Sequence, residues 1–257
     1  MTLQSSSWLF DLGNTRLKWA RLDGNAMGDV HALPHAESGR SDKRFDDAFA
    51  NIEAGATAWL ASVASEALTM EITAALERRG VRVCHVHTQA GFAGVQIAYA
   101  EPARLGVDRF LALIAAHARA QRAWLIVSVG TALTLDLLAA DGTHHGGLIA
   151  PSPALMRESL AQRAPQLPLH GGAVIDFATT TPDALASGCT WMARALIERS
   201  LHAATRRIGT MPILLLSGGG AAVLDDATRV DDWPTPIERE PHLVLHGLRL
   251  WALAQGR

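Results

Sequence analysis

Apolar runs and helical patterns alternate along the chain and predict an α/β protein. Short apolar or alternating segments, typical of strands, are residues 8–10, 16–21, 58–63, 81–87 and 212–216, and residues 124–150 are expected to form three strands. Apolar residues at helical spacing predict helices over residues 66–79, 105–119, 153–163, 182–206 and 242–254. Residues 24–50 are polar and are expected to form a surface loop with some helix. Strands followed by mixed helices and strands, twice over, indicate two similar halves.

A strand–turn–strand pattern occurs once in each half of the chain. Residues 8–24 and 124–142 each read as an apolar strand, a turn that begins with glycine, and a second strand that ends at Asp-Gly. Aligning Gly13 with Gly130 pairs Asp11 with Ser128, Asn14 with Thr131 and Leu17 with Thr134. We therefore predict a duplicated domain, with the N-terminal domain at residues 1–119 and the C-terminal domain at residues 120–257.

Composition narrows the class of protein. Of the 257 residues, 49% are hydrophobic and 19% are charged, so a full globular core is expected. A net charge of −2 argues against a nucleic-acid or membrane binder. Two cysteines far apart, no basic N-terminal leader and no long uninterrupted apolar run predict a cytoplasmic protein without membrane spans.

The first turn carries groups that could bind phosphate. Asp11 ends an apolar strand, where its carboxylate could hold Mg²⁺ directly or through water. Gly13 permits the turn, Asn14 and Thr15 offer donors, and Lys18 could reach a phosphate as a point charge. The alternative is an ordinary hairpin turn, in which Asn and Gly are common. The related turn at Gly130 and Thr131 favours the phosphate-binding interpretation, because two such turns could grip a nucleotide.

Other polar clusters give weaker signals. Asp108 and Arg109, in the first turn of a predicted helix, could place a base beside an anion-binding group, or Asp108 could be an ordinary helix-start acid. Residues 217–220, Ser-Gly-Gly-Gly, are more simply interpreted as a flexible strand-to-helix turn. The histidine pair at 144–145 follows a predicted hairpin turn and is expected on the solvated surface.

Taken together, these motifs resemble the type III pantothenate kinase family, which includes proteins named Bvg accessory factor. The family motif D-x-G-N-T-x-x-K matches residues 11–18, and G-x-D-R matches residues 106–109. The motif D-x-G-T-A-x-T-x-D matches residues 128–136 except that Ser128 replaces the leading aspartate. G-G-x-I-x-P matches residues 146–151, and residues 181–188 resemble T-x-x-A-I-x-S-G. The order and spacing of the motifs extend over nearly the whole chain.

The resemblance implies a fold, a reaction and a set of site residues. The fold would be two RNase H-like domains of the acetate-and-sugar-kinase/Hsp70/actin superfamily. The reaction would be phosphorylation of pantothenate by ATP, the first step of coenzyme A biosynthesis, in a homodimer. ATP would bind through Asp11, Leu12, Gly13, Asn14, Thr15, Arg16, Leu17, Lys18 and Thr131. Pantothenate would bind through Tyr99, Gly106, Val107, Asp108, Arg109 and, from the other protomer, Thr181.

The resemblance also implies roles for ions and leaves two alternatives. Asp108 would be the general base and Asp11 would hold Mg²⁺, directly or through water. Ser128 occupies the position of an aspartate that helps the family to bind K⁺ or NH₄⁺, so little dependence on such an ion is expected. One alternative function is a non-catalytic accessory or regulatory protein with the same fold. The other is a kinase for a different small hydroxylated acid.

Overall fold

The computed structural model describes residues 6–35, 43–226 and 233–255, which fall into two compact units. The first unit contains Met1–Phe92, Tyr99–Ala115 and Leu243–Arg257, and the second contains Ala93–Ala98 and Ala116–His242. Each unit therefore consists of several separate segments of the chain. The division into two domains at residues 119 and 120 stays a prediction. Within the described residues, no helix is both long and apolar enough to cross a membrane.

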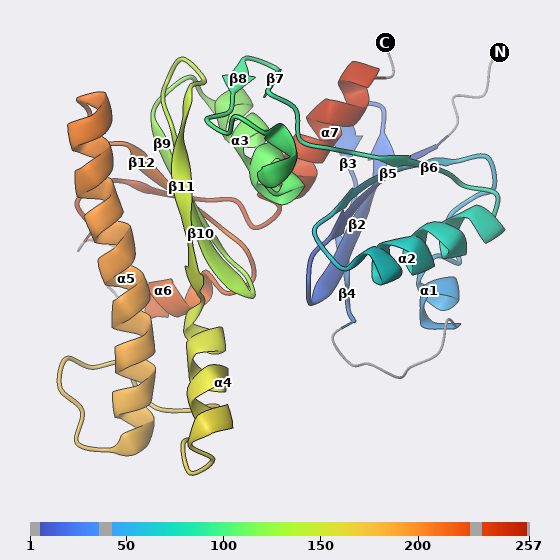
Figure 1. Cartoon of the computed structure of the whole chain (residues 1–257). Helices are drawn as coiled ribbons and strands as arrows, with labels where there is room; N and C mark the ends of the chain where they lie inside the picture. Colours follow the sequence, from blue (N-terminus) through green and yellow to red (C-terminus); the bar gives the residue numbers. More distant parts are fainter. Residues whose placement is uncertain (1–5, 36–42, 227–232, 256–257) are drawn as a thin grey trace. The chain divides into compact units, whose positions relative to one another are not determined.

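The first unit is built on a mixed sheet with the order β3-β2-β1-β5-β6 (Figure 1). Its strands are β1 (Ser7–Leu12), β2 (Arg16–Asp23), β3 (Ala26–Met27), β5 (Thr57–Ser62) and β6 (Arg82–His85), and β4 (His31–Pro34) also pairs with β2. β1 runs antiparallel to β2 and parallel to β5. The helical elements are α1 (Lys43–Ala48), α2 (Glu66–Arg78), η1 (Pro102–Arg104), α3 (Val107–Arg119, as far as Ala115) and α7 (Leu243–Gln255).

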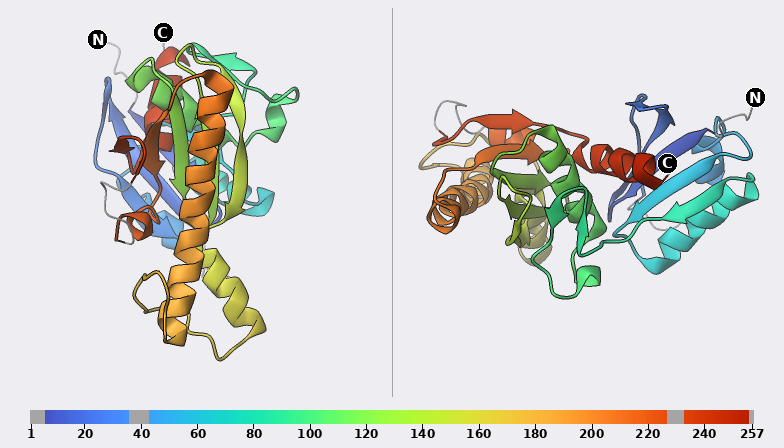
Figure 2. Two further views of the ribbon diagram at one scale, coloured as in Figure 1. Left: turned by 90° about the vertical axis from the view of Figure 1, so that its left-hand side faces the viewer. Right: turned by 90° about the horizontal axis from the view of Figure 1, so that it is seen from above.

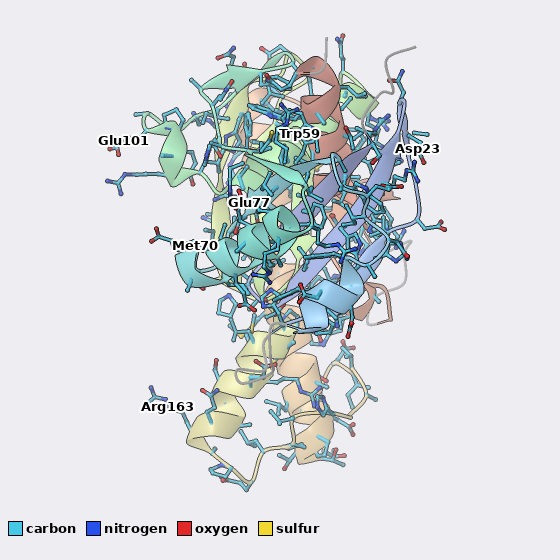
Figure 3. All side chains as sticks on the ribbon, turned by 90° about the vertical axis from the view of Figure 1, so that its right-hand side faces the viewer. Asp23, Trp59, Met70, Glu77, Glu101 and Arg163 are labelled. Carbon is cyan, nitrogen blue, oxygen red and sulfur yellow. The ribbon has the colours of Figure 1, made fainter. Side chains whose placement is uncertain are left out.

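Both faces of β1 are buried, which explains its uninterrupted apolar sequence. Phe10 and Leu12 belong to a core cluster with residues of α1 and α2, including Phe45 and Leu76. Met70 lies on the outer face of α2 and is 64% exposed (Figure 3). The prediction that residues 24–50 form a surface loop is wrong for Phe45 and Phe49, which are both fully buried. The prediction failed because it used the average composition of a mainly polar segment, which does not show that its two phenylalanines are buried.

Helix α7 completes the first unit, although it lies far from the rest of that unit in sequence. It packs on β1, β2 and β5, and its Trp251 ring lies 4.5 Å from that of Phe92 and 6.0 Å from that of Phe110. Gly247 crosses α3 so closely that a Cβ on it would lie 2.0 Å from the carbonyl oxygen of Leu111. The helix is therefore an integral layer of this unit.

The second unit repeats the same strand arrangement, with the sheet order β11-β10-β9-β12-β13. Its strands are β9 (Trp124–Val129), β10 (Ala132–Leu138), β11 (His144–Pro151), β12 (Ile213–Ser217) and β13 (Ile237–Arg239). The short strand β8 (Val95–Gln96) also belongs to this unit, whereas β7 (Gly91–Phe92) belongs to the first. α4 (Pro153–Arg163) packs along the first half of the long helix α5 (Thr181–Ile208), as Figure 2 shows, and α6 (Ala222–Asp226) follows β12.

The two sheets agree strand by strand, which is the architecture that the sequence duplication predicted. β1 and β2 form an antiparallel hairpin, as do β9 and β10. On its other side β1 pairs in parallel with β5, and β9 pairs in parallel with β12. The detailed alignment is wrong after the turn, however. Asp11 pairs with Lys18, and Ser128 pairs with Thr134, so Lys18 rather than Leu17 corresponds to Thr134. The second turn is one residue shorter than the first, which shifts every later position.

Candidate functional site

The first turn connects β1 to β2 through residues 13–15 and is held by two backbone contacts and one side chain. The N–H of Gly13 donates to the carbonyl of Arg16 at 3.0 Å, which closes the turn. His35, only 7% exposed, donates from Nε2 to the carbonyl of Gly13 at 2.8 Å, and its own N–H donates to the carbonyl of Thr15 at 3.0 Å. This role of His35 could not be predicted from the sequence, because a polar segment without a recognisable motif separates His35 from Gly13.

Asp11, Lys18 and Asp108 form one electrostatic cluster in the first unit. Lys18 lies directly across the hairpin from Asp11. Burial raises the pKa of the Asp11 carboxyl from 3.8 to about 7; the positive charge of Lys18 opposes this rise and the negative charge of Asp108 adds to it. The fold therefore places two carboxylates and an ammonium group, far apart in sequence, within electrostatic reach of one another.

The start of α3 holds the predicted substrate-binding group. The carbonyl of Gly106 accepts from the N–H of Phe110 at 3.1 Å, so this glycine directly precedes the first helical residue, Val107. A Cβ on Gly106 would lie 2.6 Å from Oδ1 of Asp108, so a larger residue would displace this carboxylate. The same Oδ1 accepts from the backbone N–H of Arg109 at 2.8 Å. The positive end of the helix favours negative charge at Asp108.

Arg109 is almost fully buried and is oriented by an aromatic side chain. It is 6% exposed, and its Nη1 donates to the hydroxyl of Tyr99 at 3.2 Å. Its guanidinium carbon lies 5.8 Å from the centre of the Tyr99 ring. The structure thus brings together Tyr99, Gly106, Asp108 and Arg109, and Val107 is buried in the same turn of helix. That these residues bind a substrate stays a prediction.

The second turn presents a neutral counterpart of the first. Gly130 donates its N–H to the carbonyl of Ala132 at 2.9 Å, and Thr131 is exposed at the tip. Paired residues of neighbouring strands place their side chains on the same face. In the first sheet this row reads Lys18, Asp11 and Ala61; in the second it reads Thr134, Ser128 and Ser217. The second sheet therefore has hydroxyl groups, Thr134 and Ser128, at the two positions where the first sheet has the charged Lys18 and Asp11.

The glycines at 218–220 form a packed turn rather than the flexible one expected. Gly218 has a φ of 88°, and a Cβ on it would lie 2.4 Å from the carbonyl oxygen of Val129. The N–H of Gly220 donates to the same oxygen at 2.9 Å. Because Val129 directly precedes Gly130, residues 218–220 pack against the residue at which the second turn starts.

Two further predicted positions lie in the second unit. Thr181 is exposed at the first residue of α5. His144 was expected on the solvated surface, but this prediction is wrong, because the residue is only 2% exposed. Its Nε2 lies 3.0 Å from Oδ1 of Asp136, which is itself 3% exposed. The pairing of these residues across a hairpin is a tertiary contact that position after a turn does not reveal.

The donors present suit a metal ion held together with phosphate groups. Within the described ranges, no three or more His, Cys, Asp or Glu side chains are grouped to hold a metal ion. In nucleotide sites, one or two carboxylates, waters and substrate phosphates bind Mg²⁺. Asp11, two residues before the turn at Gly13, could serve as such a carboxylate. A dedicated protein cage for the ion is not required.

Comparisons with known proteins identify a family. Residues 8–203 match the model of the family described as type III pantothenate kinase. A protein of Stenotrophomonas maltophilia named type III pantothenate kinase is 50% identical over 97% of this chain and 98% of its own. A solved structure from Campylobacter jejuni, described as a Baf family transcriptional activator, has a TM-score of 0.59 at 18% identity and covers 97% of this chain and 98% of its own.

A more distant solved structure shares the fold alone. MreB 5 of Spiroplasma citri, bound to AMPPNP, has a TM-score of 0.50 at 10% identity and covers 98% of this chain and 97% of its own. The arrangement of two similar sheets in this chain is thus also the fold of that protein.

Proposed function

The chain belongs to the type III pantothenate kinase family, and we propose that it transfers the γ-phosphoryl group of ATP to the primary hydroxyl of pantothenate. The product, 4′-phosphopantothenate, is the first intermediate toward coenzyme A. The observation that carries the assignment to particular residues is the cluster of Asp11, Lys18, Asp108 and Arg109 in one unit. Because ATP is the phosphoryl donor, we place the reaction in the cytoplasm.

The two turns would bind ATP. Residues 11–18 and Thr131 offer backbone N–H groups, hydroxyls and the Lys18 ammonium group to the phosphates. Phosphoryl transfer requires positioning and charge neutralisation more than covalent chemistry. Mg²⁺, held with the help of Asp11, would neutralise charge on the phosphate oxygens when it is bound.

The start of α3 would bind and activate pantothenate. Asp108 would accept the proton of the primary hydroxyl as that oxygen attacks the γ-phosphorus, a contribution of roughly 10²–10⁴-fold to the rate. Arg109, oriented by Tyr99, would bind the pantothenate carboxylate through its planar fork of donors. Gly106 leaves the space in which the Asp108 carboxylate sits.

A coupled ADP-release assay on the purified protein, with and without pantothenate, tests the function. We expect ADP release that saturates with pantothenate and yields a phosphorylated product of the corresponding mass. Release with another small hydroxy acid but not with pantothenate would indicate a different kinase. No release with any acceptor would instead favour the alternative of a non-catalytic accessory or regulatory protein.

The active form is proposed to be a homodimer in which Thr181 serves the site of the other protomer. Support comes from large apolar side chains exposed on the second unit: Ile149 at 68%, Phe177 at 93% and Met192 at 65%. Met192 is on α5, and the segment that contains Phe177 is tied to α5 by the bond from the Ile175 N–H to the Ser187 hydroxyl at 3.0 Å. Exposed apolar side chains of this size are typical of protein–protein contacts.

Replacing Met192 with aspartate is expected to dissociate the dimer and to raise the KM for pantothenate, since Thr181 would be lost from the site. Analytical ultracentrifugation and steady-state kinetics on the same samples measure both effects. The control is Met70→Asp, which changes a methionine of equal exposure, 64%, on α2 of the first unit (Figure 3). A fully active wild-type monomer would contradict the proposal.

A second expected result is that activity depends little on K⁺ or NH₄⁺. Ser128 and its neighbours Thr134 and Ser217 supply neutral oxygens, and Asp136, the nearby carboxylate that could compensate, is bound to His144. An ion site without a negative charge should be weak. Initial rates in Tris buffer with and without KCl, at constant ionic strength, check this result, and Ser128→Asp is expected to introduce activation. Steep, saturable activation of the wild type by millimolar K⁺ would disprove it.

A further inference from the structure

His35 contacts both ends of the first turn, residues 13–15. Its backbone N–H donates to the carbonyl of Thr15 at 3.0 Å, and its Nε2 lies 2.8 Å from the carbonyl oxygen of Gly13. A carbonyl oxygen can only accept, so Nε2 carries a proton and donates it. The His35 side chain is buried, whereas Asn14 at the tip of the turn is exposed. All of these residues belong to the first unit, so the contacts lie within one compact body.

The two contacts of His35 depend on different parts of the residue. The bond to Thr15 comes from the backbone and continues the pairing of β4 with β2, in which Pro34 lies opposite Arg16. Any residue except proline at position 35 can therefore make this bond. The bond to Gly13 comes from the imidazole and requires a side chain that reaches the turn with a donor. A substitution of His35 can thus remove the second bond and keep the first.

The bond from Nε2 sets the direction of the peptide group between Gly13 and Asn14. In a planar trans peptide, the carbonyl and the N–H of the next residue point in opposite directions. Because the carbonyl of Gly13 is held toward His35, the N–H of Asn14 points away from His35. Glycine permits more backbone conformations than any other residue, so without this bond the peptide group could turn over.

We propose that His35 is a positioning residue for nucleotide phosphate: its side chain holds the peptide between Gly13 and Asn14 in the orientation in which the Asn14 N–H faces the phosphate. If the peptide turned over, a carbonyl oxygen would face the same phosphate. A charge-assisted hydrogen bond would then be replaced by repulsion between an anion and the negative end of a dipole. The assignment of the turn to phosphate rests on the proposed function, but the contact between His35 and Gly13 does not.

Three substitutions isolate the side-chain bond. His35→Leu and His35→Asn both keep the backbone bond to Thr15 and lose the donor to Gly13, since leucine is apolar and the asparagine amide is too short to reach. In His35→Gln the amide nitrogen can take the place of Nε2. We expect the dissociation constant for ATP to rise about tenfold or more in the first two variants, as for one lost hydrogen bond to a charged group. It should stay much closer to the wild-type value in His35→Gln. If His35→Leu does not fold, His35→Asn supplies the same comparison.

Adenosine separates a lost phosphate contact from a general loss of structure. Calorimetric titrations with ATP and with adenosine, which has no phosphate, are compared for each protein. We expect adenosine to bind all variants as it binds the wild type. Parallel losses of ATP and adenosine binding in His35→Leu and His35→Asn would overturn the proposal, as would unchanged ATP binding in both. Equal losses of ATP binding in His35→Gln and His35→Leu would also overturn it.

His31 provides a matched control on the same strand. It is an exposed histidine of β4 that pairs with Trp19, and the two rings stack with their centres 5.3 Å apart. Its position on β4 is four residues from His35 and lies opposite the middle of β2 rather than the turn. We expect His31→Leu to leave the dissociation constants for ATP and adenosine unchanged. A loss of ATP binding in His31→Leu equal to that in His35→Leu would assign the effect to β4 as a whole and overturn the proposal.

An observation that needs no activity reports on the peptide itself. The sequence contains only two Gly-Asn pairs, Gly13-Asn14 and Gly24-Asn25, so ¹³C-carbonyl glycine combined with ¹⁵N-asparagine gives two correlated backbone signals. We expect the Asn14 signal to shift in His35→Leu and to move on addition of ATP to the wild type, while the Asn25 signal stays in place in both experiments. An Asn14 signal that neither the substitution nor ATP moves would overturn the proposal. A protein whose Asn14 signal behaves as expected but that fails to phosphorylate pantothenate would disprove the proposed function and leave the role of His35 intact.

Discussion

Replacing Asp108 with asparagine is expected to reduce pantothenate phosphorylation at least about 100-fold, because the side chain can no longer accept the hydroxyl proton. Asparagine preserves the shape of the side chain and an oxygen that can accept from the Arg109 N–H, so the start of α3 should remain intact. ATP binding should stay near that of the wild type, since the proposed nucleotide contacts lie on the two turns. The loss should therefore be seen in kcat rather than in the affinity for ATP.

Steady-state kinetics combined with calorimetric titration of ATP measure the two quantities. Asp23→Asn is a suitable control, because this carboxylate lies on the outside of the same unit (Figure 3) and is paired with Arg21 at 2.8 Å. Turnover of Asp108→Asn close to that of the wild type would exclude Asp108 as the base.

Asp11→Asn is expected to abolish most Mg²⁺-dependent activity and at the same time to stabilise the metal-free protein above neutral pH. Burial raises the pKa of Asp11 from 3.8 to about 7, with Lys18 opposing the rise and Asp108 adding to it. A carboxyl with a raised pKa in the folded state stabilises the fold fully below its unfolded pKa, and this contribution disappears as the pH rises through the folded pKa. The wild type should therefore lose stability between about pH 4 and pH 7 relative to the variant.

Thermal melts of both proteins across this range, in EDTA, measure the difference. At pH 4 the two melting temperatures should be similar. At pH 8 the variant should melt about 3 °C or more above the wild type, as roughly 1 kcal/mol would produce in a chain of this size. An equal or higher melting temperature for the wild type at pH 8 would show that the buried charge has no net cost. A lower activity with a higher stability would identify Asp11 as a site residue kept for function.

Local patterns in the sequence were sufficient for most of the secondary structure and for the duplication. The strand–glycine–strand pattern is carried by adjacent residues, so both hairpins could be predicted, and the start of α3 at Val107 lies within two residues of the predicted one because Asp108 marks the first turn. Grouping of Asp11 with Asp108 came only through resemblance, because no periodicity links residues on β1 and α3. Similarly, the family motifs named Tyr99 but could not show that its hydroxyl accepts from Arg109.

Long-range contacts explain what could not be predicted. The burial of Phe45 and Phe49 depends on a sheet face that residues far along the chain complete. His144 is buried because Asp136 and Ala98 lie on either side of it, and His35 holds Gly13 across the hairpin. The one-residue difference between the two turns is visible only in the strand register. For His35 and His144, the partner is a residue that only folding brings near, and the neighbouring residues in sequence do not indicate it.

The packing of α7 into the first unit has a consequence for synthesis on the ribosome. Residues 7–115 are made early, but the layer that contacts β1, β2 and β5, and that places Gly247 against Leu111, is made only when residues 243–255 are translated. At roughly 5–20 residues per second the early strands would wait on the order of ten seconds or more with one face uncovered. The main segment of the second unit, Ala116–His242, is translated in that interval, so the second unit is complete before α7 is made. The half that is synthesised first is thus the half that finishes folding last, and nascent chains truncated before α7 should depend on chaperones.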